Sequence, residues 1–361
     1  MKQMMLAVAL LTFSVPAFAQ LGGIGGALKK AQDSKQKVDD LTISEAEERQ
    51  IGEDVSTKIR QRFGVVQDPA IHKYVTLLGT TLAKESERPN LNWTFVVLDT
   101  DGVNAFASPG GIVHVTRGAL GLARNEAELA GVLGHEIGHV AHKHTVNAIK
   151  KSNAVKMGSE AASARSSFLS SYANKAYEMV LENNFDRGDE LDADKVGVDL
   201  VQKAGYKAAS LGDFLERLDE RNKNQAEKNG LFASHPETKE RIDKIRKQAS
   251  AASSGSAVVE PRFKANVKYQ VTPLEAVAVG KDATASTPPP AESKEEPKKK
   301  GFGLGNMKQA VAPESKSTQV SASGGARGLG ADRAAKGGSN PTLVKTTVSS
   351  ADVETFKKGI T

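Results

Sequence analysis

The sequence contains no cysteine. Disulfides, a thiol nucleophile, thiolate metal ligands and a lipid-modified N-terminal cysteine are therefore excluded, and any metal site must use His, Asp or Glu. Aromatic residues make up only 5% of the chain, and no basic patch is interleaved with them. The sequence therefore lacks the signature of a nucleic-acid-binding protein.

Long apolar runs are also missing after residue 20, so we expect the mature chain to be soluble or peripherally membrane-associated. Before that point, Lys2 precedes the apolar run Met4 to Val15 and the small-residue site Ala17-Phe18-Ala19. This pattern is typical of a secretory signal peptide cleaved after Ala19. A transmembrane anchor is the alternative, but a spanning helix needs roughly 20 apolar residues. We interpret residues 1–19 as a signal peptide and expect export to the periplasm.

The net charge of +6 is concentrated at the C-terminal end. Residues 251–361 contain 16 Lys and Arg against 10 Asp and Glu, so they carry the whole excess. Their composition of Ala, Ser, Gly, Pro and Lys indicates a mostly disordered tail, which could contact the membrane or the cell wall through its lysines. Within it, residues 258–279 could form a strand or two or a docked extended segment. Residues 20–40 read as a flexible glycine-rich leader, which leaves 41–250 as the folded domain.

Hydrophobic spacing predicts the elements of this domain. Ser44 and Glu47 form a capping box before one amphipathic helix, and Asp68-Pro69 begins a second. A small sheet is expected over residues 93–98, 103–107 and 112–115. The remaining pattern is helical over residues 117–123, 125–149, 154–182, 187–204, 209–228 and 235–249. The predicted fold class is therefore α+β, mainly helical, with a small β-sheet.

The motif His135-Glu136-Ile137-Gly138-His139 carries the clearest chemistry. Residues four apart share a helix face, so both imidazoles can bind one zinc ion. Glu136 lies beside them, where its carboxylate can activate a zinc-bound water and pass the proton to the leaving amine. A bare motif of this kind also arises by chance, so the rest of the site must be found elsewhere. His142 and His144, just beyond, are expected to face solvent or a carboxylate, with a secondary metal contact as the alternative.

A catalytic zinc commonly takes three protein ligands. The metzincin pattern would require glycine at 142 and histidine at 145, but the chain has His142 and Thr145. The other option is a glutamate on a later helix, and Glu190 offers one. Asp194, one turn further on, can accept the second N–H of a zinc-bound histidine. A solvated acidic helix face is the simpler alternative for Glu190, because other aspartates surround it.

With these motifs the chain resembles the zinc metallopeptidases that include the CAAX prenyl proteases and the HtpX-like membrane proteases, and within them the soluble periplasmic BepA-like branch. The resemblance covers roughly residues 44–249. It rests on four spaced motifs: Asn104 to Ala107 with Pro109 to Gly111; His135 to His139; Arg187 with Glu190, Ala193 and Asp194; and Ser234 to Pro236 with Thr238 and Arg241.

This resemblance implies a zincin-like gluzincin fold with one zinc per chain, bound by His135, His139 and Glu190. It also implies that Glu136 is the general base and acid, and that Asp194 lies behind the ligands. His235 would sit near the metal as an oxyanion-holding group or as a removable ligand, oriented by Arg241. The strand Asn104, Ala105, Phe106 and Ala107 would bind the substrate backbone. The chain departs from the BepA-like branch in lacking its helical repeats, which puts that branch's partners in doubt.

Two functions are weighed. The first is a zinc metalloendopeptidase that hydrolyses misfolded or misassembled cell-envelope proteins. The second is a chaperone-like envelope assembly factor that uses the zinc cleft for binding. The intact Glu136 favours the first, because a pure binder has no need of a base.

Overall fold

Two amphipathic helices open the described part of the chain. The computed structural model describes residues 43–151, 162–182, 185–223, 238–251, 255–279, 332 and 334–360, and residues 45–361 belong to one unit. Helix α2 (Glu45–Phe63) buries the predicted stripe of Ile51, Val55 and Ile59. Helix α3 (Pro69–Ala83) begins as predicted, with Asp68 accepting a hydrogen bond from the Ala70 amide. The predicted signal peptide and leader lie outside the described residues.

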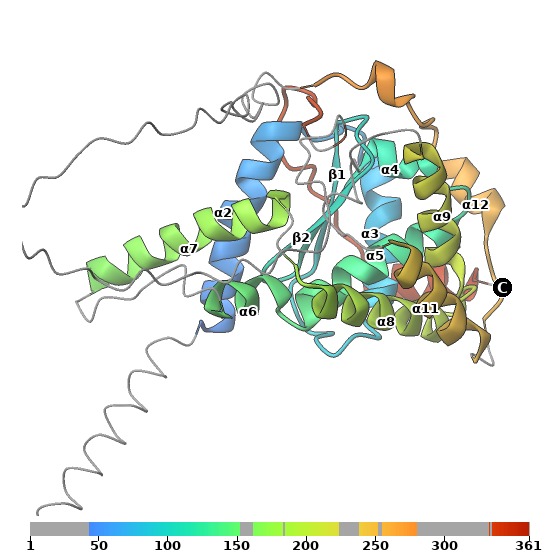
Figure 1. The fold of residues 1–361 in the computed structure, drawn as a ribbon, viewed down its shortest axis with the longest axis horizontal. Coiled ribbons are helices and arrows are strands. Elements are labelled where there is room, and N and C mark those ends of the chain that lie inside the picture. The colour runs from blue at the N-terminus through green and yellow to red at the C-terminus, as the bar shows by residue number, and fades with distance from the viewer. Residues whose placement is uncertain are drawn as a thin grey trace, which may run out of the picture. The chain divides into compact units, whose positions relative to one another are not determined.

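A three-stranded sheet follows these helices. It consists of β1 (Thr94–Leu98), β2 (Ala105–Ser108) and β3 (Ile112–Thr116) in the order β1-β3-β2. Strand β3 is central, parallel to β1 and antiparallel to β2. Helices α2 and α7 (Ala162–Glu182) lie on one side of the strands, and α3 and α5 (Glu126–Ala141) lie on the other (Figure 1). The strands are therefore buried between helices.

The helical segment predicted over 125–149 is broken in two. After the short helix α4 (Arg117–Leu122), α5 ends at Ala141 and α6 (His144–Lys151) begins three residues later. Lys143, between them, has φ 56°, a left-handed conformation that is uncommon for a residue with a side chain. The prediction of one continuous helix is therefore wrong. Hydrophobic spacing continues across this turn, so it gives no sign of the break.

Three more helices complete the second half of the domain. They are α8 (Arg187–Lys203), α9 (Ser210–Asn222) and α11 (Thr238–Ser250). Helix α8 packs along α5, and α11 packs on both α8 and α9 (Figure 1). The structure confirms the predicted mainly helical, zincin-like α+β fold with its small sheet beside the helix of the His-Glu motif.

Part of the C-terminal region forms helices that pack on the domain. Helix α12 (Glu260–Asn266) and the turn η1 (Leu274–Ala276) occupy the segment expected to be a strand or a docked extended stretch, and α13 (Ser350–Lys358) lies against α3. Pro261 at the start of α12 favours the helix. For these residues the structure differs from the disorder expected over 251–361. The basic stretch around residue 300 lies outside the described residues.

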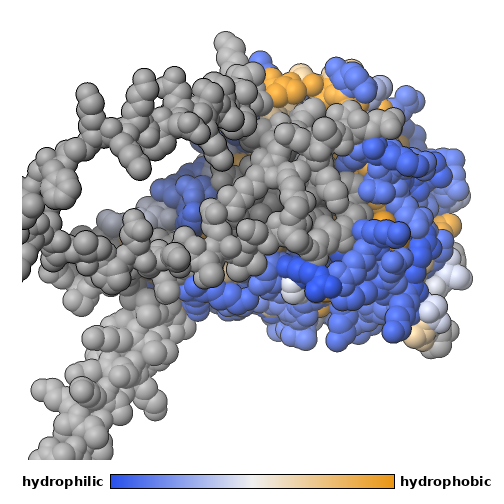
Figure 2. Space-filling model, in the orientation of Figure 1, coloured by the Kyte–Doolittle hydropathy of each residue, from blue (hydrophilic) through white to orange (hydrophobic). Residues whose placement is uncertain are grey.

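The visible surface of the described residues is mostly hydrophilic, with hydrophobic colour gathered at its upper edge (Figure 2). Among the described residues the exposed large hydrophobic side chains are Val258, Val271 and Val279. None of the described helices has the length and hydropathy needed to cross a membrane.

Candidate metal centre

Helix α5 carries the His-Glu motif in the middle of the domain. The Asn125 side chain caps its first turn by accepting a hydrogen bond from the Glu128 amide at 3.0 Å. The side chains of His135, Glu136 and His139 are all nearly completely buried. The helix therefore holds three ionisable groups inside the domain, where each must be matched by a partner or a bound ion.

Helix α8 approaches α5 closely because glycines face each other across the contact. A Cβ atom added to Gly197 of α8 would lie 2.9 Å from the backbone nitrogen of His135, and one added to Gly138 would lie 3.1 Å from the Cα of Ala193. Both distances are shorter than ordinary carbon contacts, so side chains there would push the helices apart. This close approach brings Glu190 and Asp194 opposite the histidines.

Three side chains converge at this contact. The Nε2 atoms of His135 and His139 lie 3.1 Å apart. Glu190 places one carboxylate oxygen 3.4 Å from Nε2 of His139 and the other 3.7 Å from Nε2 of His135. The three groups offer ligand atoms that lie within 4.8 Å of one another. Two imidazoles and one carboxylate are a donor set that zinc takes in catalytic sites, so these residues fit a bound metal ion.

Asp194 and Arg241 lie behind the ligands. Oδ1 of Asp194 lies 2.9 Å from Nδ1 of His135, where it fixes the ring with Nε2 facing Glu190. Arg241, from α11, binds both oxygens of Asp194 and also lies 2.9 Å from Glu190. Its guanidinium is buried, so α11 supplies the cation that balances both carboxylates.

Burial shifts the proton affinities in this centre. It raises the pKa of Glu136 to about 7, with the neighbouring Glu190 charge acting in the same direction. It also lowers the pKa of His135 to about 3, although Asp194 opposes the shift. For Asp194, burial acts upward but the Arg241 charge prevails and brings the pKa to about 2. Near neutral pH His135 is thus uncharged and can act as a metal ligand, and Glu136 can exchange a proton.

Comparison with known proteins places this centre in a family. The sequence profile of peptidase family M48 matches residues 69–249, which include both helices of the metal centre. The chain belongs to peptidase family M48.

Curated relatives agree with this assignment. The chain is 33% identical over 177 residues to the metalloprotease YcaL of Escherichia coli, covering 46% of this chain and 68% of that protein. It is 25% identical over 221 residues to the beta-barrel assembly-enhancing protease of Yersinia pestis, covering 58% of this chain and 45% of that protein. It is 27% identical to the mitochondrial metalloendopeptidase OMA1 of Schizosaccharomyces pombe over 55% of this chain and 60% of that protein. The match thus spans about half the length of the beta-barrel assembly-enhancing relative.

The other predicted site residues of this M48 chain lie on strand β2, on α11 and outside the described residues. Asn104 precedes β2, and Ala105 to Ala107 form most of the strand; all four are buried, and α7 contacts β2. A role for them in binding substrate stays a prediction. His235 lies outside the described residues, so its place near the metal stays a prediction as well. Arg241, expected to orient His235, is bound to Asp194 and Glu190.

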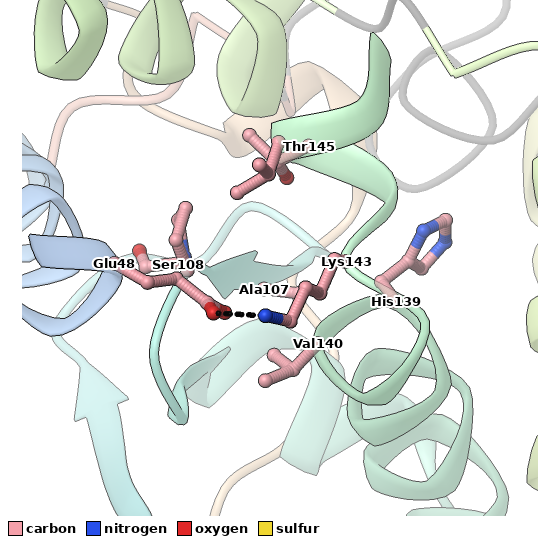
Figure 3. A pocket seen from close by; sticks show the side chains of 9 residues that line it. Glu48, Ala107, Ser108, His139, Val140, Lys143 and Thr145 are labelled. Carbon is pink, nitrogen blue, oxygen red and sulfur yellow. Dashed lines mark ion pairs between the residues drawn. The ribbon is translucent and has the colours of Figure 1, made fainter. Parts of the chain in front are cut away.

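A small pocket adjoins the metal centre between β2 and the end of α5. Its volume is about 10 Å³, room for roughly one water molecule. Figure 3 shows Lys143 reaching Glu48 across this pocket, a 3.2 Å ion pair, while the imidazole of His139 points away from it. The pocket is therefore too small, as it stands, to hold a substrate side chain.

Two rings that were not predicted to contact His139 lie against it. Nδ1 of His144 lies 3.0 Å from Nδ1 of His139, and the ring of Phe185 packs 4.2 Å from the His139 ring. Burial lowers the pKa of His144 to about 4, with the neighbouring His139 acting in the same direction and Asp192 opposing the shift. The turn at Lys143 brings His144 back onto His139. No periodic signal marks that turn in the sequence.

Proposed function

We propose that this chain is a zinc metalloendopeptidase of the cell envelope that cleaves misfolded or misassembled proteins. The observation that carries the proposal is the convergence of His135, His139 and Glu190 beside a buried Glu136. A purely structural zinc site has no use for an additional carboxylate at that position.

His135, His139 and Glu190 would hold the zinc ion. When bound there, zinc would polarise a peptide carbonyl and lower the pKa of a coordinated water. The protein's own part is to keep His135 neutral and oriented. Burial keeps His135 neutral, Asp194 orients its ring from 2.9 Å, and Arg241 keeps Asp194 ionised.

Glu136 is the group assigned to proton transfer. It neighbours the first histidine along α5 and is buried, and burial brings its pKa to about 7. A carboxylate with a pKa near the working pH accepts a proton from the attacking water and donates it to the departing amine more readily than one that stays fully ionised. A bound zinc ion would lower this pKa and favour the ionised carboxylate, which is the form that accepts a proton from the attacking water.

Two observations support envelope proteins as substrates. One relative is named for enhancing beta-barrel assembly, and residues 1–19 have the pattern of a signal peptide that would direct export to the periplasm. Main-chain pairing with Asn104 to Ala107 would bind an extended polypeptide with little regard to sequence, as suits unfolded substrates. Because α7 contacts β2, such binding would require α7 to move.

The test compares Glu136→Gln with Glu216→Gln, which changes a half-exposed carboxylate on α9. Zinc is measured by elemental analysis, and cleavage is followed on unfolded casein. Glu136→Gln should retain zinc and lose casein cleavage by a factor of about 10² to 10⁴, while Glu216→Gln should match the wild type. Retained cleavage in a zinc-loaded Glu136→Gln protein would contradict the proposal.

The chaperone-like alternative predicts a different result in cells. If binding alone were the function, Glu136→Gln would restore envelope integrity to a deletion strain as well as the wild type does. A proteolytic function requires that this variant fail while Glu216→Gln succeeds.

A further inference from the structure

A second group of metal-binding side chains lies beside the first. His142 caps the C-terminus of α5, His144 begins α6, and Asp192 comes from the second turn of α8. One oxygen of Asp192 contacts Nδ1 of His142 and lies 3.1 Å from Nε2 of His144. The three residues offer ligand atoms within 4.8 Å of one another. None of them belongs to the donor set of the first centre.

The backbone turn creates this convergence. Histidines two residues apart on a continuous helix point to different faces. Lys143, between them, has φ 56°, and this conformation turns both rings toward α8. A left-handed conformation costs about 1 kcal/mol or more for a residue with a Cβ atom, so the surrounding contacts must hold it.

The surroundings favour a cation. Oε2 of Glu87 lies 3.5 Å from Nε2 of His142, and Oδ1 of Asp189 lies 4.0 Å from Nε2 of His144. Lys151 reaches Asp189 at 4.0 Å and offsets part of this negative charge. The group is also open to solvent, because the side chains of His142 and Asp192 are 26% and 40% exposed. An ion can therefore reach it without passing through the first centre.

We propose that His142, His144 and Asp192 form a second, weaker site for zinc or a similar divalent ion. Two imidazoles and a carboxylate are ligands that zinc accepts, with a fourth position left for water. The site goes beyond the peptidase function, because its occupancy does not depend on catalysis.

The contact between His144 and His139 couples the two sites. A neutral imidazole carries one N–H, so a ring that binds metal through Nε2 carries its hydrogen on Nδ1. With zinc in the first site alone, His139 donates from Nδ1 to Nδ1 of His144, which donates from Nε2 to Asp192. With metal on Nε2 of both rings, two N–H groups face each other at 3.0 Å. Filling the second site therefore disturbs the orientation of His139.

Excess zinc should consequently inhibit the enzyme. This consequence rests on the proposed function, whereas the metal count does not. If the chain had no peptidase activity, the second ion would still bind, and the two failures can be told apart.

The experiment counts zinc ions in the full chain. Apo protein is titrated with zinc by calorimetry, and the bound metal is confirmed by elemental analysis after equilibration at fixed free zinc. The wild type should bind two ions, one tightly and one weakly. His142→Asn and Asp192→Asn should each keep the tight ion. Their affinity for the weak ion should fall by more than the 10–100-fold expected when a residue that only supports a metal ligand is removed. Asp199→Asn, which removes a carboxylate elsewhere on α8, should keep both ions.

Retention of the tight ion also reports that each variant has folded. Saturation of the wild type at one ion, or two ions in His142→Asn, overturns the proposal. Loss of both ions in His142→Asn and also in Asp192→Asn overturns it as well, since the second site would then not be independent. In the activity assay, the ratio of cleavage rates at excess and at stoichiometric zinc should fall well below one for the wild type and stay near one for His142→Asn.

Discussion

Arg241 and Asp194 form a buried two-pronged ion pair behind the metal centre. Arg241 donates from Nε and from Nη2 to the two carboxylate oxygens, both at 2.7 Å. The same guanidinium lies 2.9 Å from Glu190. A residue of α11 thus neutralises the ligand carboxylate and the carboxylate that orients His135, which connects the stability of the domain to its affinity for metal.

Replacing this arginine should therefore harm both properties. Arg241→Ala leaves two buried carboxylates without their cation, and breaking a buried pair in this way costs about 3–5 kcal/mol of unfolding free energy. Zinc affinity should fall about 10–100-fold because the support of His135 is lost. Urea unfolding and zinc titration measure the two effects.

The matched control for this prediction is Arg246→Ala on the same helix. Arg246 pairs with Glu216 and is 42% exposed, so its loss should change the stability by no more than about 1 kcal/mol. Arg241→Lys keeps the charge but cannot contact both oxygens of Asp194 at once, so its loss of stability and of zinc affinity should be intermediate. Equal stability losses for Arg241→Ala and Arg246→Ala would contradict the assigned role.

Zinc removal should destabilise the folded domain. An ion that binds only the native state adds about 4 kcal/mol to the unfolding free energy when its free concentration is 1,000 times its dissociation constant. We expect a chelator to lower the thermal midpoint of the wild type, with free zinc buffered so that one ion is bound per chain. Glu190→Gln should show little difference between the zinc-loaded and chelated samples. A full zinc-dependent gain in that variant would exclude Glu190 as a ligand.

The parts of the site that could be predicted are those whose residues lie close together in the sequence. His135 and His139 share one helix face through their spacing alone, and Glu190 with Asp194 repeats that spacing, so the structure brings these four residues together as predicted. The partner of Asp194 lies 47 residues away. Long-range ion pairs leave no periodic trace, so Arg241 could be singled out only through the family resemblance, and with a different partner.

The C-terminal region illustrates the same limit. Low-complexity composition indicates that a segment cannot build a core of its own, but not that it cannot pack on an existing one. Glu126 looks like an ordinary acidic residue in the first turn of α5. In the structure it is fully buried and binds Tyr74, Tyr206 and Arg262. The arginine comes from α12, 136 residues further along the chain.

Helix α13 should accordingly contribute to stability. The Phe356 ring lies under the Arg262 guanidinium at 3.9 Å, is buried, and packs edge-on against Tyr74. Phe356→Ala should cost about 3 kcal/mol and should expose residues 340–361 to limited proteolysis. Thr355→Ala, at an exposed neighbouring position, should change the stability by less than about 0.5 kcal/mol. Equal protease sensitivity of the two variants would show that the helix does not depend on this contact.

His114 should make the stability depend on pH in the mildly acidic range. It lies in the central strand β3, fully buried, with Nε2 2.9 Å from the Ser56 hydroxyl. Burial lowers its pKa from 6.5 to about 3, so between these values the unfolded chain binds a proton that the folded chain excludes. The stabilisation is complete above pH 6.5 and falls with pH by at most about 1.4 kcal/mol per unit as the pH drops toward 3. Urea unfolding at pH 7, 6 and 5 should therefore show a steeper decline for the wild type than for His114→Gln, which has no titrating group at this position. Identical slopes in the two proteins would mean that His114 is protonated equally in the folded and unfolded chains, contrary to its burial between the helices.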